Sequence, residues 1–310
     1  MGLYLLLTAI LVYLGVLLRV AYFTLIERKC LSSLGIRLGP NKVRVGGILQ
    51  PVTDGIKLFV KEFAIPANSA KIFLVVPSIS LLLCFIGWQL FPSSGFSSSC
   101  SNDILFFLVV TRLNAHVAII RGWASNSKYA RVGRVRGFAQ VISYEICLRI
   151  TLVIVIFLRG GVRFFSSSEN GWSLWWGLAW VPIILSWLTI CLAETNRAPF
   201  DIVEAESELV SGFNVEYSAG GFAVLFIAEY GMIMLMCTVT TWAFLQNSKI
   251  WAVSGIVIIF IKVGILIFFF IWVRASLPRL RYDLLILICW VSLLPAVLGV
   301  YGFIMYAIKI

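Results

Sequence analysis

Residues 3–26 read LYLLLTAILVYLGVLLRVAYFTLI, an apolar run with a single charged side chain. About 20 apolar residues are enough for a helix to cross the hydrocarbon core of a membrane, so this run predicts a transmembrane helix. The run is too long for the apolar region of a cleaved signal peptide, and no basic segment precedes it. We therefore expect this helix to be retained.

The composition of the whole chain points the same way. Of its 310 residues, 61% are hydrophobic and 13% are charged. A water-soluble domain of this length needs more polar groups on its surface. We predict an all-α polytopic membrane protein, with residues 1–310 forming one integral membrane domain. The net charge of +11 is explained by basic loops on one side of a membrane, so no nucleic-acid partner is expected.

Apolar segments of similar length recur along the chain. We predict eight spans at residues 3–26, 72–91, 104–121, 138–158, 174–193, 218–244, 250–273 and 284–307. Most Lys and Arg residues fall in the loops after the first, third, fifth and seventh spans. The positive-inside rule then places these loops in the cytoplasm or mitochondrial matrix, with both termini on the other side.

Between the first two spans, apolar residues recur at helical spacing from Ile48 to Phe63, with charged residues between them. This pattern predicts an amphipathic helix lying in the membrane interface. Such a helix could anchor the loop to the surface, or it could form one wall of a cavity that opens at membrane level.

The loop after the fifth span is unusually acidic for a connector at a membrane edge. Its carboxylates are Glu194, Asp201, Glu204, Glu206, Glu208 and Glu216, against one arginine, Arg197. Carboxylates crowded next to hydrocarbon cannot all be ionised without a large cost in free energy. The loop is therefore a candidate site for proton handling or charge sensing.

Several ionisable residues fall inside the predicted spans: Arg19, Arg112, His116, Glu145, Arg149, Glu229 and Lys262. Each charge at the centre of a lone helix costs about 2.5–3.5 kcal/mol on insertion scales, so these side chains need partners inside the protein. Glu145 and Arg149 are four residues apart, which predicts an ion pair. Glu229 and Lys262 lie on adjacent spans and could pair. Arg112 is expected to meet an acidic group or a lipid phosphate.

The sequence offers no recognisable site for a bound redox cofactor. His116 is the only histidine, and the seven cysteines are scattered without a Cys-x-x-Cys pair. A core hydrogen-bonding role suits His116 better than that of a single haem ligand. No nucleotide-binding or nucleophile motif is present. We expect this chain to bind no flavin, iron–sulfur cluster, haem or metal, and to hold no catalytic residue of its own.

Short polar motifs punctuate the chain in a distinctive order. They read ERK at 27–29, RLGPNKV at 37–43, LQPVTDGIKL at 49–58, GWASNSKY at 122–129, ISYE at 142–145, AETNRAPFD at 193–201, EAESELVSGFNVEY at 204–217, AEY at 228–230, WVRA at 272–275 and PRLRYD at 278–283. Together they resemble the NADH dehydrogenase subunit 1 family, the quinone-site membrane subunits of respiratory complex I. The resemblance covers nearly the whole chain.

The resemblance implies both a fold and a function. It implies eight transmembrane helices plus an interfacial helix between the first two, in the mitochondrial inner membrane or, alternatively, a bacterial plasma membrane. The chain would form the entrance of the ubiquinone channel and link quinone reduction by the redox arm to proton translocation in the membrane arm. Ubiquinone is then the expected substrate. The expected partners are the quinone-site redox-arm subunits, neighbouring membrane-arm subunits and membrane lipids.

The resemblance also assigns residues by motif. The implied quinone-channel residues are Glu27, Arg28, Arg37, Asp54, Lys57, Arg197, Phe213 and Arg274. The implied acidic loop beneath the channel comprises Asp201, Glu204, Glu206, Glu208 and Glu216. The implied charged path into the membrane arm comprises Glu145, Glu194 and Glu229. This chain departs from the family pattern at Arg112, His116, Arg131, Arg134 and Arg149.

Two other interpretations stay open at this point. A membrane subunit of a related membrane-bound hydrogenase would share the fold and replace quinone with a ferredoxin or formate partner. The complete motifs at 27–28 and 194–217 favour the quinone form. A stand-alone ion transporter would carry inverted repeats or paired broken helices, and the sequence shows neither.

Overall fold

The computed structural model describes residues 2–66, 69–91, 102–159, 174–202, 216–245 and 253–309, and within these ranges all regular structure is helical. The helices are α1 (Gly2–Leu34), α2 (Gln50–Val60), α3 (Val76–Trp88), α4 (Asp103–Ala124), α5 (Lys128–Arg159), α6 (Leu174–Glu194), α8 (Ala219–Phe244), α9 (Val253–Ser276), α10 (Tyr282–Leu287) and α11 (Leu294–Lys309). A π-helical segment, Ile288–Leu293, joins α10 to α11. The prediction of an all-α fold is confirmed.

Each of the eight predicted spans overlaps at least one helix of the structure. In the described part of the chain, six helical segments are long and apolar enough to cross a membrane: Ile10–Leu34, Asp103–Ala124, Lys128–Leu158, Ala219–Phe244, Val257–Ser276 and Tyr282–Tyr306. Two further segments, Val76–Trp88 and Val181–Glu194, are apolar but shorter. These helices indicate a membrane protein, and the count of eight spans stays a prediction.

The helix ends follow local chemistry. Pro51 and Pro77 lie in the first turns of α2 and α3, where a missing backbone N–H breaks no intrahelical hydrogen bond. Two helices are longer than the apolar runs that predicted them: α1 continues past Ile26 to Leu34, and α5 already begins at Lys128. Hydropathy marks only the part of a helix that suits hydrocarbon, whereas backbone hydrogen bonding continues beyond it.

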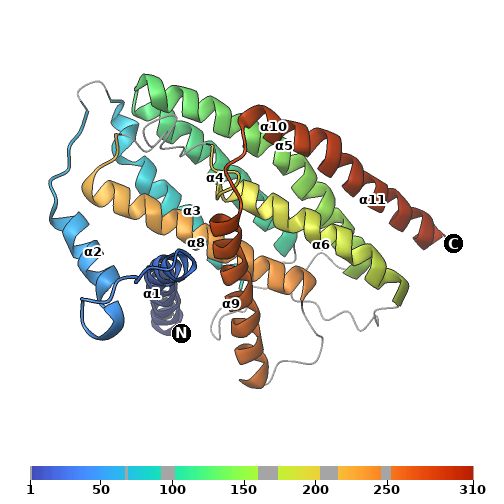
Figure 1. Cartoon of the computed structure of the whole chain (residues 1–310), viewed down its shortest axis with the longest axis horizontal. Coiled ribbons are helices and arrows are strands. Elements are labelled where there is room, and N and C mark those ends of the chain that lie inside the picture. The colour runs from blue at the N-terminus through green and yellow to red at the C-terminus, as the bar shows by residue number, and fades with distance from the viewer. Residues whose placement is uncertain are drawn as a thin grey trace.

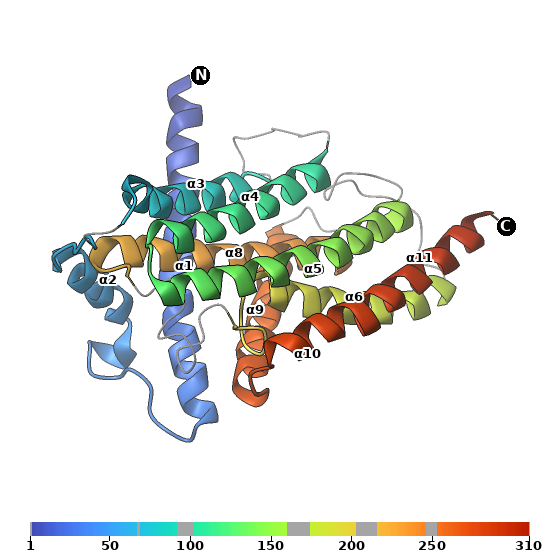
Figure 2. The ribbon, with the colours of Figure 1, turned by 90° about the horizontal axis from the view of Figure 1, so that it is seen from above.

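Most of the helices run alongside one another in a bundle, and α1 and α9 cross that bundle (Figures 1 and 2). Within it, α8 packs against α1, α2, α3 and α9, while α5 packs against α4, α6, α10 and α11. Helix α8 thus brings the crossing helices and α2 together, which positions the site described below.

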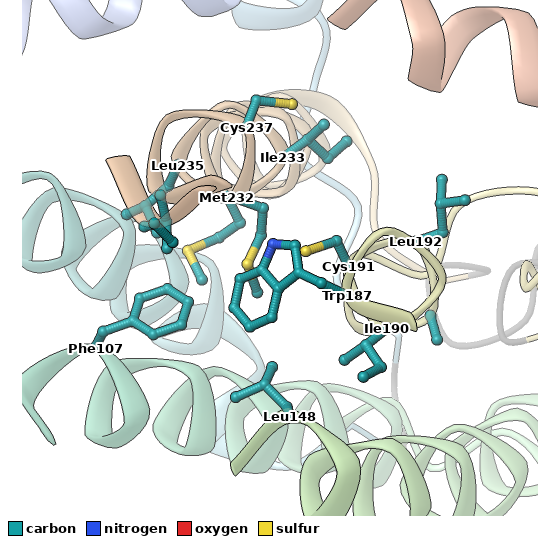
Figure 3. Packing of buried hydrophobic residues seen from close by; sticks show 14 of the residues in the cluster. Phe107, Leu148, Trp187, Ile190, Cys191, Leu192, Met232, Ile233, Leu235 and Cys237 are labelled. Carbon is teal, nitrogen blue, oxygen red and sulfur yellow. The ribbon is translucent and has the colours of Figure 1, made fainter. Parts of the chain in front are cut away.

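The core of the bundle is filled by large side chains from four helices. Trp187 of α6 is fully buried and lies among Phe107 of α4, Leu148 of α5, and Met232 and Leu235 of α8 (Figure 3). Between membrane helices such packing stabilises through close van der Waals contact, because lipid chains are as apolar as the side chains. The core therefore fixes the end of α6, from which the acidic loop starts.

Helix α2 lies between α1 and α3 along the chain, and none of its residues is buried. Its apolar side chains include Val52, Ile56 and Phe59, which are 50%, 59% and 65% exposed. Such a surface suits contact with lipid or with another apolar molecule. Its orientation in the plane of a membrane stays a prediction.

Candidate functional site

A buried carboxylate on α1 lies at the centre of a dense polar cluster. The Glu27 side chain is only 6% exposed, and its Oε1 accepts hydrogen bonds from Arg197, at 2.9 Å from Nη1, and from Arg274. The Tyr230 hydroxyl donates to Oε2 at 2.6 Å. A buried carboxylate is costly unless it is paired and hydrogen-bonded, and these three donors meet that need. We call these four residues the Glu27 cluster.

The Glu27 cluster joins segments that are far apart in the sequence: α1, the loop after α6, α8 and α9. The guanidinium carbon of Arg197 also lies 4.4 Å from the centroid of the Tyr230 ring, a cation–π geometry. Within these four residues, two guanidinium groups share one carboxylate. These guanidinium groups can stabilise negative charge that develops on an oxygen atom of a bound molecule.

Arg197 is carried by a loop that α5 holds in place. Gln140 of α5 is fully buried, and its Nε2 donates hydrogen bonds to the backbone oxygens of Ala193 and Phe200, each at 3.0 Å. Carbonyl groups in a buried irregular segment need such partners, because water does not reach them. The glutamine therefore fixes both ends of the turn that presents Arg197.

The next residue on α1 connects the cluster region to α2. Arg28 Nη1 lies 2.5 Å from Asp54 Oδ2, and Gln50 Nε2 donates to Asp54 Oδ1 at 2.8 Å. The Arg28 and Asp54 side chains are 54% and 35% exposed, so this pair contributes little free energy of folding. Its effect is to set how α2 lies against α1. Lys29 adds a hydrogen bond to the carbonyl of Gly46.

The described part of the acidic loop lies against the segment between α9 and α10. Asp201 Oδ2 is 3.3 Å from Arg279 Nη2, and the N–H of Leu280 donates to the oxygen of Pro199 at 3.0 Å. A surface cavity of about 500 Å³ opens here, lined by Arg136, Ile202, Arg279, Leu280, Arg281, Tyr282 and Asp283. Glu216 is half-buried. The described residues do not include Glu204, Glu206, Glu208 or Phe213.

The predicted ion pair on α5 is confirmed, and it has a third member. Glu145 accepts hydrogen bonds from Arg149 on its own helix and from Arg112 Nη1 of α4 at 2.7 Å. The expectation that Arg112 meets an acidic group is therefore also confirmed. His116 Nδ1 lies 2.8 Å from the carbonyl oxygen of Arg112, but the ring is exposed and not in the core, where the sequence placed it.

The suggested pairing of Glu229 with Lys262 is wrong. Glu229 Oε1 lies 2.5 Å from Nη1 of Arg121, whose side chain is only 4% exposed. Lys262 instead donates to the backbone oxygen of Leu245 at the end of α8. The two residues are on adjacent helices, but the rotation of each helix about its axis decides which side chains meet.

The third acid of the predicted path, Glu194, ends α6. Its Oε2 is buried and has no hydrogen-bond partner among the described residues. Glu194 is close enough to Glu145 for the two carboxyl groups to interact electrostatically. The three acids of the path thus come from α5, α6 and α8, and the structure gives an arginine partner to Glu145 and to Glu229.

Of the residues that the resemblance assigned to a quinone channel, the structure brings Glu27, Arg197 and Arg274 together and pairs Arg28 with Asp54 nearby. Arg37 and Lys57 are exposed and lie outside both groups. The assignment missed Tyr230, Gln140 and Arg121. The sequence does hold a signal for the first two, since a hydroxyl or an amide in an apolar helix needs a hydrogen-bond partner.

A second tyrosine lies near the Glu229–Arg121 pair. The Tyr217 ring stacks on Phe73 with 4.2 Å between centroids, and its hydroxyl is buried with no hydrogen-bond partner in the described ranges. Burial raises the pKa of Tyr217 to about 12, an effect that the nearby Arg121 charge partly opposes. Tyr217 therefore stays protonated at neutral pH.

Comparison with known proteins shows similarity over almost the whole chain. A family model described as NADH dehydrogenase matches residues 7–305. Three relatives named NADH-ubiquinone oxidoreductase chain 1 come from Aedes aegypti (44% identical over 303 residues, 97% of this chain and 95% of the relative), Carassius auratus (44% over 287, 92% and 89%) and Chondrus crispus (42% over 301, 94% and 92%).

In the described part of the chain, no group of three or more His, Cys, Asp or Glu side chains could hold a metal ion.

Proposed function

The chain belongs to the NADH dehydrogenase family, and from this we propose that it is a core membrane subunit of respiratory complex I, the proton-translocating NADH:ubiquinone oxidoreductase. It would cross the mitochondrial inner membrane eight times, with α2 lying in the interface between the first two spans. Its partners would be the quinone-site subunits of the redox arm, neighbouring membrane-arm subunits and lipids. The chain by itself would hold no complete active site.

The observation that carries the proposal is the Glu27 cluster. Reduction of a quinone to a quinol adds two electrons and two protons, so negative charge develops on the quinone oxygens before the protons arrive. The guanidinium groups of Arg197 and Arg274, held by a buried carboxylate, are suited to stabilise that charge. We propose that the quinone head group passes or rests beside this cluster.

The entrance of the channel would lie between α1, α2 and α8. These three helices pack against one another. Ile26 of α1 and Ile56 and Phe59 of α2 are 48–65% exposed in this chain and provide apolar surface for an isoprenoid tail. Such a tail enters from the membrane, and the apolar side chains and the Arg28–Asp54 pair would then lie along its route.

Electrons would reach the quinone from the redox arm, and the contribution of this chain would be electrostatic. Uptake of protons by the reduced quinone leaves the donating groups more negative, and that change would disturb the titration of nearby carboxyl groups. The acidic loop, from Asp201 to Glu216, would pass the change to Glu194, Glu145 and Glu229. The alternative is that the loop only docks the redox arm through surface ion pairs.

One substitution tests the role of the cluster. Arg274→Gln removes a cation from the Glu27 cluster, and Arg131→Gln is the matched control, because Arg131 is exposed at the start of α5 and outside the cluster. In complex purified from membranes, we expect Arg274→Gln to lower the rate of short-chain quinone reduction by about a hundredfold, as for loss of one charge-stabilising donor. NADH oxidation by a hydrophilic artificial acceptor should not change. Equal quinone reduction by both variants would contradict the proposal.

A further inference from the structure

Helices α4 and α5 pack side by side along the bundle (Figure 2), and together they carry a charged group in the middle of an apolar face. The Glu145 side chain is 9% exposed, whereas the side chains of its two partners, Arg112 and Arg149, are each 48% exposed. The carboxylate is thus enclosed, and both guanidinium groups reach the surface of the chain.

The surroundings of the two arginines are those of a helix face that meets an apolar environment. Val109 and Leu113 on α4 and Ile142 and Val153 on α5 are 36–55% exposed. Val109 lies three residues from Arg112, and Ile142 and Val153 lie seven and four residues from Arg149, so these three share a stripe with the arginines, while Leu113 lies beside Arg112 and four residues after Val109. Arg112, Arg149 and the exposed His116, one turn after Arg112, are therefore polar positions within a surface whose other exposed side chains named here are apolar.

Both arginines lie deep within their helices. At 1.5 Å of rise per residue, Arg112 is roughly 14 Å from Asp103 at one end of α4 and roughly 18 Å from Ala124 at the other. Arg149 is roughly 14 Å from Leu158, the end of the apolar part of α5. These positions fall near the middle of a hydrocarbon core about 30 Å thick.

We propose that a transmembrane helix of a neighbouring complex subunit covers this face and presents a carboxylate to Arg112 or Arg149. Two guanidinium groups with one carboxylate leave an excess positive charge, and an arginine at this depth does not face lipid chains. The partner is expected to be an apolar helix with one Asp or Glu at mid-membrane depth. This inference rests on the proposed function, because it requires that the chain assembles with other membrane subunits.

Two other occupants fit the face less well. A lipid phosphate stays near the membrane surface, roughly half the core thickness away from Arg112. A second copy of this chain would bring two more arginines to a face that already has excess positive charge, and like charges at an interface repel. A carboxylate is the group that forms paired hydrogen bonds with a guanidinium in a site without water.

A structure of the complete complex, purified with its native lipids, tests the proposal directly. We expect an Asp or Glu oxygen from another polypeptide within about 4 Å of a guanidinium nitrogen of Arg112 or Arg149, the usual limit for an ion pair. The proposal is overturned if these groups meet only lipid phosphate, a second copy of this chain, or a carboxylate from residues 203–215 of the chain itself.

Two variants provide an independent test in solution. Arg149→Gln would remove the excess charge, and Arg131→Gln is the matched control at the exposed start of the same helix. The fraction of each membrane subunit kept with the chain in detergent and salt would be measured by quantitative mass spectrometry. For Arg149→Gln we expect about tenfold lower retention of one subunit, as when one member of a buried charge pair is removed. Retention equal to that of Arg131→Gln would overturn the proposal.

These tests separate the inference from the proposed function. A complex that contains this chain and reduces quinone, but offers no carboxylate to either arginine, overturns the inference alone. A chain that purifies without other complex subunits overturns both. If Arg149→Gln prevents assembly altogether, the structure of the unmodified complex still decides the question.

Discussion

Tyr230→Phe is the smallest change that tests the Glu27 cluster, because it removes one oxygen atom and leaves an aromatic ring beside Arg197. The hydroxyl donates to Glu27 at 2.6 Å, and Tyr230 is 9% exposed. A hydrogen bond to a charged group contributes about 1.5–3 kcal/mol. Glu27 keeps both arginines, and the ring keeps its cation–π contact, so we take the lower limit of about 1.5 kcal/mol.

This loss should appear in quinone reduction and not in assembly. A difference of about 1.4 kcal/mol corresponds to a tenfold change, so we expect kcat/KM for a short-chain quinone to fall by about tenfold. The amount of assembled complex should be nearly normal, because the cluster keeps its ion pairs. Oxidation of NADH by a hydrophilic acceptor should also be unchanged, since that reaction does not use the quinone site.

Tyr22→Phe is the matched control, because Tyr22 is a 40% exposed tyrosine of α1 that lies outside the cluster. We expect its kcat/KM to equal that of the unmodified complex. The reasoning would be refuted if Tyr230→Phe and Tyr22→Phe gave the same kcat/KM, whether unchanged or lowered. A fall in the amount of complex without any change in turnover per complex would leave the cluster with a structural role only.

Three further predictions follow from the same architecture. Gln140→Leu should remove the side-chain hydrogen bonds to the Ala193 and Phe200 carbonyls, which keep backbone partners, and should destabilise the complex by roughly 1–3 kcal/mol, seen as a lower thermal unfolding midpoint, whereas Gln89→Leu, at an exposed hydrogen bond to Tyr13, should have little effect. A photoreactive quinone analogue should label residues 48–63; labelling confined to loops on the opposite side of the membrane would rule out this entrance. Glu206→Gln should lower quinone reduction and proton pumping together in reconstituted vesicles, and an assembled variant with normal pumping would reduce the acidic loop to a docking surface.

Hydropathy was sufficient to locate the helices, because a run of apolar residues has few other stable arrangements in a membrane. It was not sufficient to find their ends. Helix α5 extends through the basic residues Arg131, Arg134 and Arg136, where the sequence predicted a loop. These residues have good helix propensity and continue the backbone hydrogen bonds of the apolar part. Because they are charged, they lower the mean hydropathy of the segment, and hydropathy alone does not identify it as helix.

Ion pairs within one helix could be predicted, and pairs between helices could not. Glu145 and Arg149 are fixed by helical geometry alone, so their spacing was enough. Glu229 meets Arg121, which is far away in the sequence, because α4 and α8 present these side chains to each other. Whether two such residues meet depends on the rotation of each helix about its axis and on core packing around Trp187. Neither could be predicted from the sequence pattern.

The Glu27 cluster and the α4–α5 face contain the same charges in two different settings. In each, two arginines share one glutamate. At the Glu27 cluster, Tyr230 completes the shell of the carboxylate, and the arginine side chains are 18% and 38% exposed, which suits a transient negative charge on a substrate. On the α4–α5 face the arginines are nearly half exposed, and our proposal places them at mid-membrane depth, where no solvent would screen them. A transient ligand would leave that face uncompensated between turnovers, so its missing carboxylate is expected to come from a permanent neighbour.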